Sequence, residues 1–129
     1  MNHMLVLFPF EPGLYQAKGI PVTYVGHPLA DVLAMEVDMA AARERLGMSP
    51  ERPLFALLPG SRQSEVHYMG ALMIETARLL HDRFPEAAFI VPFATGETRA
   101  IFEAQLHQLQ AEDLPIRLLY GHAHDAMEA

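Results

Sequence analysis

The residues of this chain best suited to chemistry gather in one short loop, at Gly60, Ser61 and Arg62, followed by Ser64 and Glu65. Gly60 allows a positive φ or a close backbone approach, and the two serines are expected to cap the following helix or to donate hydroxyls. Arg62 supplies a forked cation that matches the oxygens of a phosphate. Together these residue types predict a cradle for a diphosphate.

The same loop has a second interpretation, as a plain turn between a strand and a helix. Gly60 and Ser61 would then serve only as turn and cap, and Arg62 would be solvated. The spacing is neither that of a Walker loop nor that of the three-glycine dinucleotide fingerprint. Spacing alone therefore leaves both interpretations open.

A strand followed directly by a helix is predicted to position the loop. The apolar run at 54–58 is typical of a buried strand, and the helix is expected from about Ser64 to Asp82. Its apolar residues recur every three or four positions, as one stripe of Val66, Met69, Met73, Ala77 and Leu80. In an open α/β sheet, ligands bind where strands end and helix N-termini attract anions.

The rest of the chain alternates short apolar runs with helical patterns. Further strands are predicted at 4–8, 22–25, 88–91 and 114–120, and further helices at 11–19, 40–46, 95–110 and 125–129. We expect the run at 4–8 to be buried on both faces, Gly47 to end a helix and Thr95 to cap one. The alternation predicts an α/β fold with a Rossmann-like parallel sheet and helices on both faces.

Composition narrows the class of protein. A chain of 129 residues, 51% hydrophobic and 19% charged, suits one globular domain. With 16 acidic and 9 basic residues the net charge is -7, which argues against nucleic acid as a partner. The absence of Cys removes disulfides and thiolate chemistry. No apolar stretch approaches the roughly 20 residues of a membrane span, so a soluble chain is expected, with peripheral membrane contact left open.

Histidines suggest no metal site. His122 and His124 have an HxH spacing, but no third ligand is placed by the sequence. His27, between Gly26 and Pro28, is expected to shape a crossover between domains rather than to catalyse.

Three stretches resemble motifs of the lipid-A-disaccharide synthases, in the family's order and spacing. Residues 57–66, LLPGSRQSEV, are similar to the family's LLPGSR-x-SEV signature. Residues 4–12, MLVLFPFEP, and 25–31, VGHPLAD, resemble two further motifs. Asn2 departs from the pattern, since the family usually carries Asp there. The likeness runs from about His3 to the end, and the chain corresponds to the middle of the longer family members.

The resemblance implies an incomplete piece of a two-domain (GT-B) inverting glycosyltransferase of lipid A biosynthesis. Such an enzyme joins UDP-2,3-diacylglucosamine to 2,3-diacylglucosamine 1-phosphate through a β-1,6 bond and releases UDP. The UDP-sugar is a substrate, so no cofactor is expected. The parent enzyme is expected to be cytoplasmic and peripheral to the inner membrane.

The resemblance also implies which domains the chain contains and which residues bind substrate. Residues 1–34 would end the acceptor-side domain and form the crossover, and 35–129 would form the first half of the donor-binding domain. Arg62 matches the family's functionally important arginine and is expected to stabilise the leaving diphosphate. Gly60 and Ser61 would add backbone or hydroxyl donors, and Glu65 would bind substrate or only favour the helix start. The general base lies outside this chain, which alone is expected to be inactive.

Two rival readings stay open. One is a different UDP-sugar enzyme of the same architecture, such as an epimerase or an N-acetylglucosaminyltransferase. The other is a non-catalytic nucleotide-binding or interaction module. In either case an unpaired edge strand and exposed apolar helix faces predict poor solubility or self-association.

Overall fold

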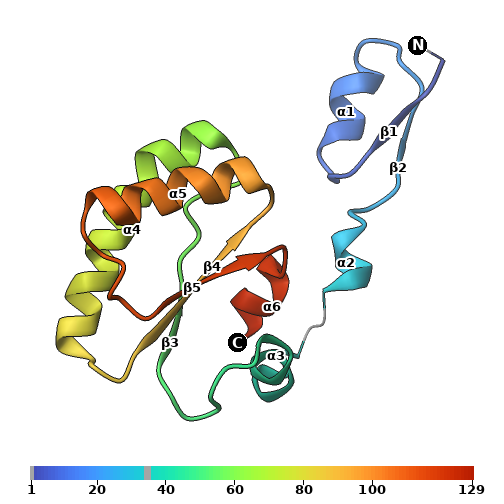
Figure 1. Cartoon of the computed structure of the whole chain (residues 1–129). Helices are drawn as coiled ribbons and strands as arrows, with labels where there is room; N and C mark the ends of the chain where they lie inside the picture. Colours follow the sequence, from blue (N-terminus) through green and yellow to red (C-terminus); the bar gives the residue numbers. More distant parts are fainter. Residues whose placement is uncertain (1, 34–35) are drawn as a thin grey trace. The chain divides into compact units, whose positions relative to one another are not determined.

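The chain forms two compact units, an N-terminal unit (Met1–Val37) and a C-terminal unit (Asp38–Ala129). The computed structural model describes residues 2–33 and 36–129 (Figure 1). The expected domain boundary between residues 34 and 35 lies outside the described residues.

The N-terminal unit is a short strand, helix and strand followed by one helical turn. Its elements are β1 (Met4–Val6), α1 (Glu11–Gln16), β2 (Val22–Tyr24) and α2 (Leu29–Val32), and β1 pairs with β2 in parallel. The predicted strands and first helix are therefore confirmed, with shorter bounds. The expectation that the first strand is buried on both faces is wrong, because Leu5 is 64% exposed while Val6 is buried. Within the described residues of this unit, one strand and one helix pack against β1, too few elements to cover both faces.

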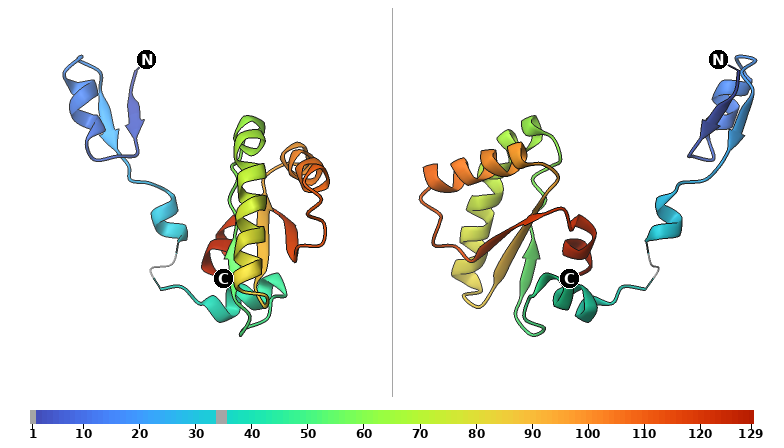
Figure 2. Two further views of the ribbon diagram at one scale, coloured as in Figure 1. Left: turned by 90° about the vertical axis from the view of Figure 1, so that its left-hand side faces the viewer. Right: turned by 45° about the vertical axis from the view of Figure 1, so that its right-hand side comes forward.

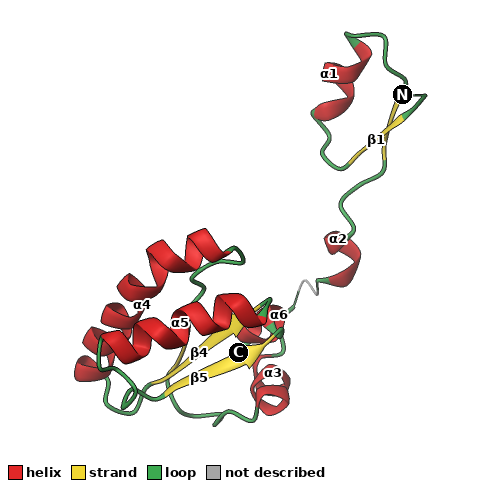
Figure 3. Ribbon diagram, turned by 45° about the horizontal axis from the view of Figure 1, so that its top comes forward, coloured by secondary structure: helices red, strands yellow, loops and turns green. Residues whose placement is uncertain are grey.

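The C-terminal unit contains a parallel sheet of three strands. These are β3 (Leu54–Ala56), β4 (Ala88–Phe93) and β5 (Ile116–Tyr120), in the order β3-β4-β5. Leu54 pairs with Ala88, and Phe89 with Ile116, and both pairings are parallel. Figure 3 shows β4 and β5 lying side by side. All six residues of the central strand β4 are buried.

Helices cover both faces of this sheet, as expected for the α/β class (Figure 2). The helices α4 (Gln63–Arg83) and α5 (Gly96–Gln108) pack on one face, and α3 (Met39–Leu46) and α6 (Ala123–Glu128) on the other. The larger core cluster includes Phe89, Val91, Phe93 and Phe102, and the smaller consists of Leu46, Ile90, Leu119 and Ala126. Alternate residues of β4 thus serve opposite layers, as the pleat of a strand requires.

The predicted stripe of α4 is confirmed at Val66 and Ala77, which are buried, and at Met73 and Leu80, which pack partly buried against the core, but not at Met69. The buried residues are Val66, Gly70, Ile74 and Ala77, whereas Met69 is 39% exposed. The reason is the close approach of α5, since a Cβ built on Gly70 would collide with the end of Gln105. A glycine at the crossing, rather than a methionine, allows the two helices to pack.

Two predicted helix ends are confirmed. Gly47 ends α3 with φ +63, and the Thr95 hydroxyl accepts a 3.3 Å hydrogen bond from the Thr98 N–H at the start of α5. The last helix begins at Ala123, two residues before the predicted Asp125.

Candidate functional site

The predicted anion loop lies between the end of β3 and the start of α4. Gly60 has φ +127, a conformation that side-chain-bearing residues rarely adopt, and a Cβ there would collide with the Cβ of Glu65. In the space left by Gly60, the Glu65 carboxylate accepts hydrogen bonds from the N–H groups of Ser61, at 2.8 Å, and Arg62, at 3.1 Å. The glycine and the carboxylate together fix the loop.

Arg62 faces solvent at the beginning of α4. Its side chain is 78% exposed, and its Nη1 donates to Oε1 of Glu65 at 2.8 Å. The Arg62 N–H lowers the pKa of Glu65 most, followed by the Ser61 N–H and then the Arg62 guanidinium. An exposed ion pair of this kind is weak, so the guanidinium can turn toward an incoming phosphate at small cost.

The serines do not cap the helix, so that expectation is wrong. Within the described residues, the hydroxyls of Ser61 and Ser64 take part in no hydrogen bond, and Arg62 is the N-cap residue. Glu65 replaces them because a carboxylate three residues after the N-cap reaches back to the free N–H groups, as in a capping box. A charged acceptor also binds them more strongly than a hydroxyl does.

A cavity of about 340 Å³ opens beside the loop, at the carboxyl ends of the strands. Three chain segments line it, namely Leu58, Gly60 and Ser61 after β3, Pro92, Phe93 and Ala94 at the end of β4, and Gly121 and Ala123 after β5. Most of these residues are apolar, so the cavity suits a flat ring or a hydrocarbon better than a charged group. Gly60 and Ser61 therefore lie at the cavity, while Arg62 and Glu65 lie beside it rather than in its lining.

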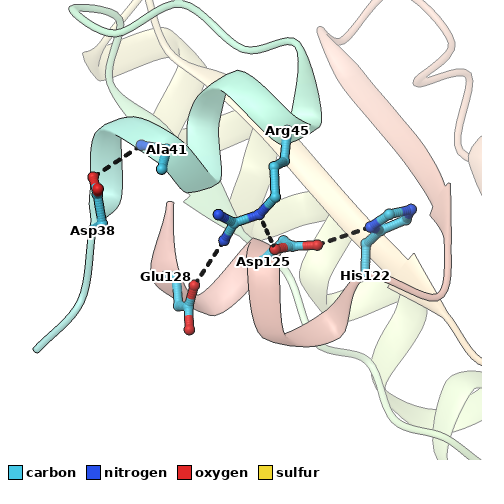
Figure 4. Close-up of polar contacts among 6 residues, drawn as sticks. All are labelled: Asp38, Ala41, Arg45, His122, Asp125 and Glu128. Carbon is cyan, nitrogen blue, oxygen red and sulfur yellow. Dashed lines mark hydrogen bonds and ion pairs between the residues drawn. The ribbon is translucent and has the colours of Figure 1, made fainter. Parts of the chain in front are cut away.

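Next to the cavity wall formed by Gly121 and Ala123 lies a polar network that the sequence did not reveal (Figure 4). Nδ1 of His122 lies 2.9 Å from Oδ2 of Asp125, whose Oδ1 accepts from Nε of Arg45 at 2.7 Å. Nη2 of Arg45 also donates to Glu128 at 3.0 Å. The hydrogen bonds from His122 and then from Arg45 lower the pKa of Asp125. No sequence pattern joins Arg45 to a partner 80 residues away.

Among the described residues, no three His, Asp or Glu side chains are grouped so that they could hold a metal ion. His122 instead pairs with Asp125. His27, in the N-terminal unit, accepts a 3.2 Å hydrogen bond from the Leu29 N–H at the start of α2.

Known proteins resemble the chain along its whole length. The family model described as lipid-A-disaccharide synthetase matches residues 1–129. The lipid-A-disaccharide synthase of Aromatoleum aromaticum is 60% identical over 129 residues, which cover all of this chain and 33% of the relative. The synthase of Azoarcus sp. is 58% identical, over all of this chain and 33% of the relative. The synthase of Pseudomonas fluorescens is 50% identical, over 98% of this chain and 33% of the relative. The chain thus spans about a third of the length of these curated relatives.

Proposed function

We propose a function from one premise: this chain belongs to the lipid-A-disaccharide synthetase family. The proposed reaction of the whole protein joins UDP-2,3-diacylglucosamine to 2,3-diacylglucosamine 1-phosphate and yields lipid A disaccharide and UDP. Because the chain spans a third of its relatives, we assign it part of the donor site and no activity of its own. The family match favours this reaction over an epimerase or a non-catalytic module.

The observation that supports a donor site is the loop at the carboxyl end of β3. Gly60 places the loop against the cavity, and Arg62 presents an exposed guanidinium beside it. In the proposed complex the cavity takes the uracil ring, and Arg62 exchanges Glu65 for the diphosphate as negative charge develops on departing UDP. The positive end of α4 acts in the same direction.

Two backbone donors of the loop already have an acceptor within the protein. The N–H groups of Ser61 and Arg62 already donate to Glu65, so they are not free for a ligand. Among the side chains of Gly60, Ser61 and Arg62, the donors proposed for the phosphate are the Ser61 hydroxyl and the Arg62 guanidinium. In this proposal Glu65 shapes the loop and affects substrate binding through it, without contacting the substrate.

The remaining assignments rest on the same premise. Residues 1–34 are proposed to end the acceptor-side domain and 35–129 to begin the donor-binding domain, and no cofactor is proposed because the UDP-sugar is a substrate. The whole protein is proposed to be cytoplasmic, with peripheral contact to the inner membrane. Every helix in the described part of the chain is too short or too polar to cross a bilayer.

Self-association is proposed for the isolated chain. The strand β3 forms one edge of the sheet in the C-terminal unit, and α4 exposes Tyr68, Leu72 and Leu79 at 59% or more. Exposed edges and apolar side chains favour pairing between copies. Sedimentation velocity at rising concentration is expected to show an increasing dimer fraction, and a monomer at all concentrations contradicts this.

Calorimetric titration of UDP tests the donor site. The titration is made into the chain and its Arg62→Ala variant, after circular dichroism has shown that both are folded. We expect at least about tenfold weaker binding by the variant, because charge-assisted hydrogen bonds to phosphate are strong. The matched control is Arg83→Ala, which removes the same charge about 30 Å further along α4 and should bind normally. A folded wild-type chain that binds no UDP, or an Arg62→Ala variant that binds equally well, contradicts the proposal.

A further inference from the structure

We infer that His122 is a positioning residue, whose hydrogen bond to Asp125 sets the shape of the turn between β5 and α6. This turn forms one wall of the cavity, and Arg45 holds Asp125 in place from α3. The inference rests on the proposed function, since the ligand concerned is the UDP that the cavity is proposed to take.

The turn has an unfavourable backbone for its sequence. Gly121 has φ +66 and His122 has φ +57, so two consecutive residues are left-handed. Glycine adopts this conformation freely, but the Cβ of a histidine crowds the neighbouring carbonyl. A non-glycine residue stays there only where its surroundings determine its conformation.

Three contacts fix the conformation of His122, of which Figure 4 shows the one with Asp125. The imidazole Nδ1 of His122 lies 2.9 Å from Asp125, and the His122 carbonyl accepts the 2.9 Å hydrogen bond from the Ala126 N–H that begins α6. Ala126 is buried, at 3% exposure, beside Ile90 of the sheet. The imidazole is thus hydrogen-bonded to α6, a helix that packs on the core through Ala126.

Asp125 is itself fixed from another element. Its second oxygen accepts from Nε of Arg45 at 2.7 Å, and Arg45 also bonds Glu128 one turn further along α6. The Asp125 side chain is only 22% exposed, which limits its alternative orientations. A defined carboxylate can therefore direct the imidazole to one position.

The turn reaches the ligand through the residues on either side of His122. Gly121 and Ala123 both line the cavity, and the Gly121 N–H donates at 2.9 Å to the carbonyl of Phe93, another lining residue. A rotation about φ of His122 must move Ala123 relative to the anchored Gly121. The His122 side chain points to Asp125 and is not part of the lining, so it acts through the turn and not by contact.

UDP titration of three variants tests this role. His122→Ala should bind about five- to tenfold more weakly than the wild type, the effect of losing one hydrogen bond, with an unchanged circular dichroism spectrum. His122→Asn should restore binding to within about twofold, because asparagine tolerates the left-handed region and keeps a polar side chain. The control is His107→Ala, which removes the other His–carboxylate pair, 2.6 Å from Glu112 and outside the cavity lining, and should bind normally.

A second readout needs no ligand. Arg45 lies in α3, so Arg45→Ala acts on the turn through its contacts with Asp125 and Glu128 of α6. The amide NMR signals of Gly121 and Ala123 should therefore move in Arg45→Ala, and the same signals should stay in place in His107→Ala. If the wild type and His122→Ala bind UDP equally well, the inference is overturned and the proposed function still stands. A folded wild type that binds no UDP defeats the proposed function. If the wild type binds no UDP, the NMR measurement still tests the positioning role. Gly121 and Ala123 amide signals that stay unchanged in the Arg45→Ala variant overturn that role, and shifted signals support it.

Discussion

Gly60 is the residue on which the geometry of the anion loop depends most. Replacing it by Ala should destabilise the chain by about 2 kcal/mol, because φ +127 is strained for any side chain and the added Cβ collides with Glu65. Urea unfolding measures the loss. Gly13→Ala is the matched control, since open space surrounds Gly13 and its φ is not positive. An unfolding midpoint unchanged by Gly60→Ala would show that the loop tolerates a different backbone.

Glu65 makes the stability of the loop depend on pH. Hydrogen bonds lower its pKa below the usual 4.5, so the ionised form favours the folded state. This stabilisation is complete above about pH 4.5 and disappears as the pH falls through the lower, folded-state pKa. The difference in unfolding free energy between the wild type and Glu65→Gln should therefore be largest near neutral pH and shrink in acid. Urea titrations from pH 3 to 7 measure it, and a gap that is constant across this range speaks against the assignment.

Residue types singled out Gly60, Ser61 and Arg62, because glycine, hydroxyl and guanidinium have specific uses near phosphate. The structure places Gly60 and Ser61 at the cavity and Arg62 beside it, and their contact with phosphate stays a proposal. For Glu65 the sequence left two roles open, and the structure places its carboxylate at the helix start, where it accepts from the Ser61 and Arg62 N–H groups. The link between Asp125 and Arg45 joins residues 80 positions apart, and only the packing of α3 on α6 brings them together.

Among the elements, α5 offers the clearest test of a helix cap. The Thr95 hydroxyl accepts from the Thr98 N–H, and the buried Thr98 hydroxyl donates at 2.9 Å to the Thr95 carbonyl. Thr95→Ala should cost about 1 kcal/mol of stability, as the loss of an N-cap usually does. The control is Thr76→Ala, in the middle of α4, where the hydroxyl donates at 2.8 Å to the carbonyl of Leu72. Chemical denaturation measures the unfolding free energy of both variants. An equal loss of unfolding free energy in Thr95→Ala and Thr76→Ala contradicts a capping role for Thr95.

Element types were more predictable than their bounds and buried faces. Period and turn residues located the strands and most helices, but the central strand was predicted to end at Val91, before Pro92. The strand continues to Phe93, whose carbonyl accepts from Gly121. The predicted stripe of α4 was right except at Met69, which is exposed. It missed Gly70, which carries no apolar side chain and whose importance depends on where α5 crosses.

At the scale of the whole molecule, the order of motifs was more informative than any single element. Three ordered stretches indicated the family, and the family model matches residues 1–129. The parallel sheet with helices on both faces was predictable from the alternation of strand and helix patterns. The poor burial of the N-terminal unit was not, since an apolar run such as residues 4–8 is buried only if other elements cover it.

The two units should differ widely in hydrogen exchange. Among the described residues of the N-terminal unit only Val6 is buried, and its two strands have three residues each, whereas β4 is buried along its whole length. Since slow exchange requires opening of a buried, packed structure, amides of β4 should exchange with the global unfolding free energy of the C-terminal unit. Amides of β1 and β2, relative to their intrinsic rates, should exchange at least about 100-fold faster. Exchange measured by NMR or mass spectrometry gives the comparison. Equal protection of β1 and β4 would mean that the N-terminal unit gains burial in solution, for which self-association is the first explanation to test.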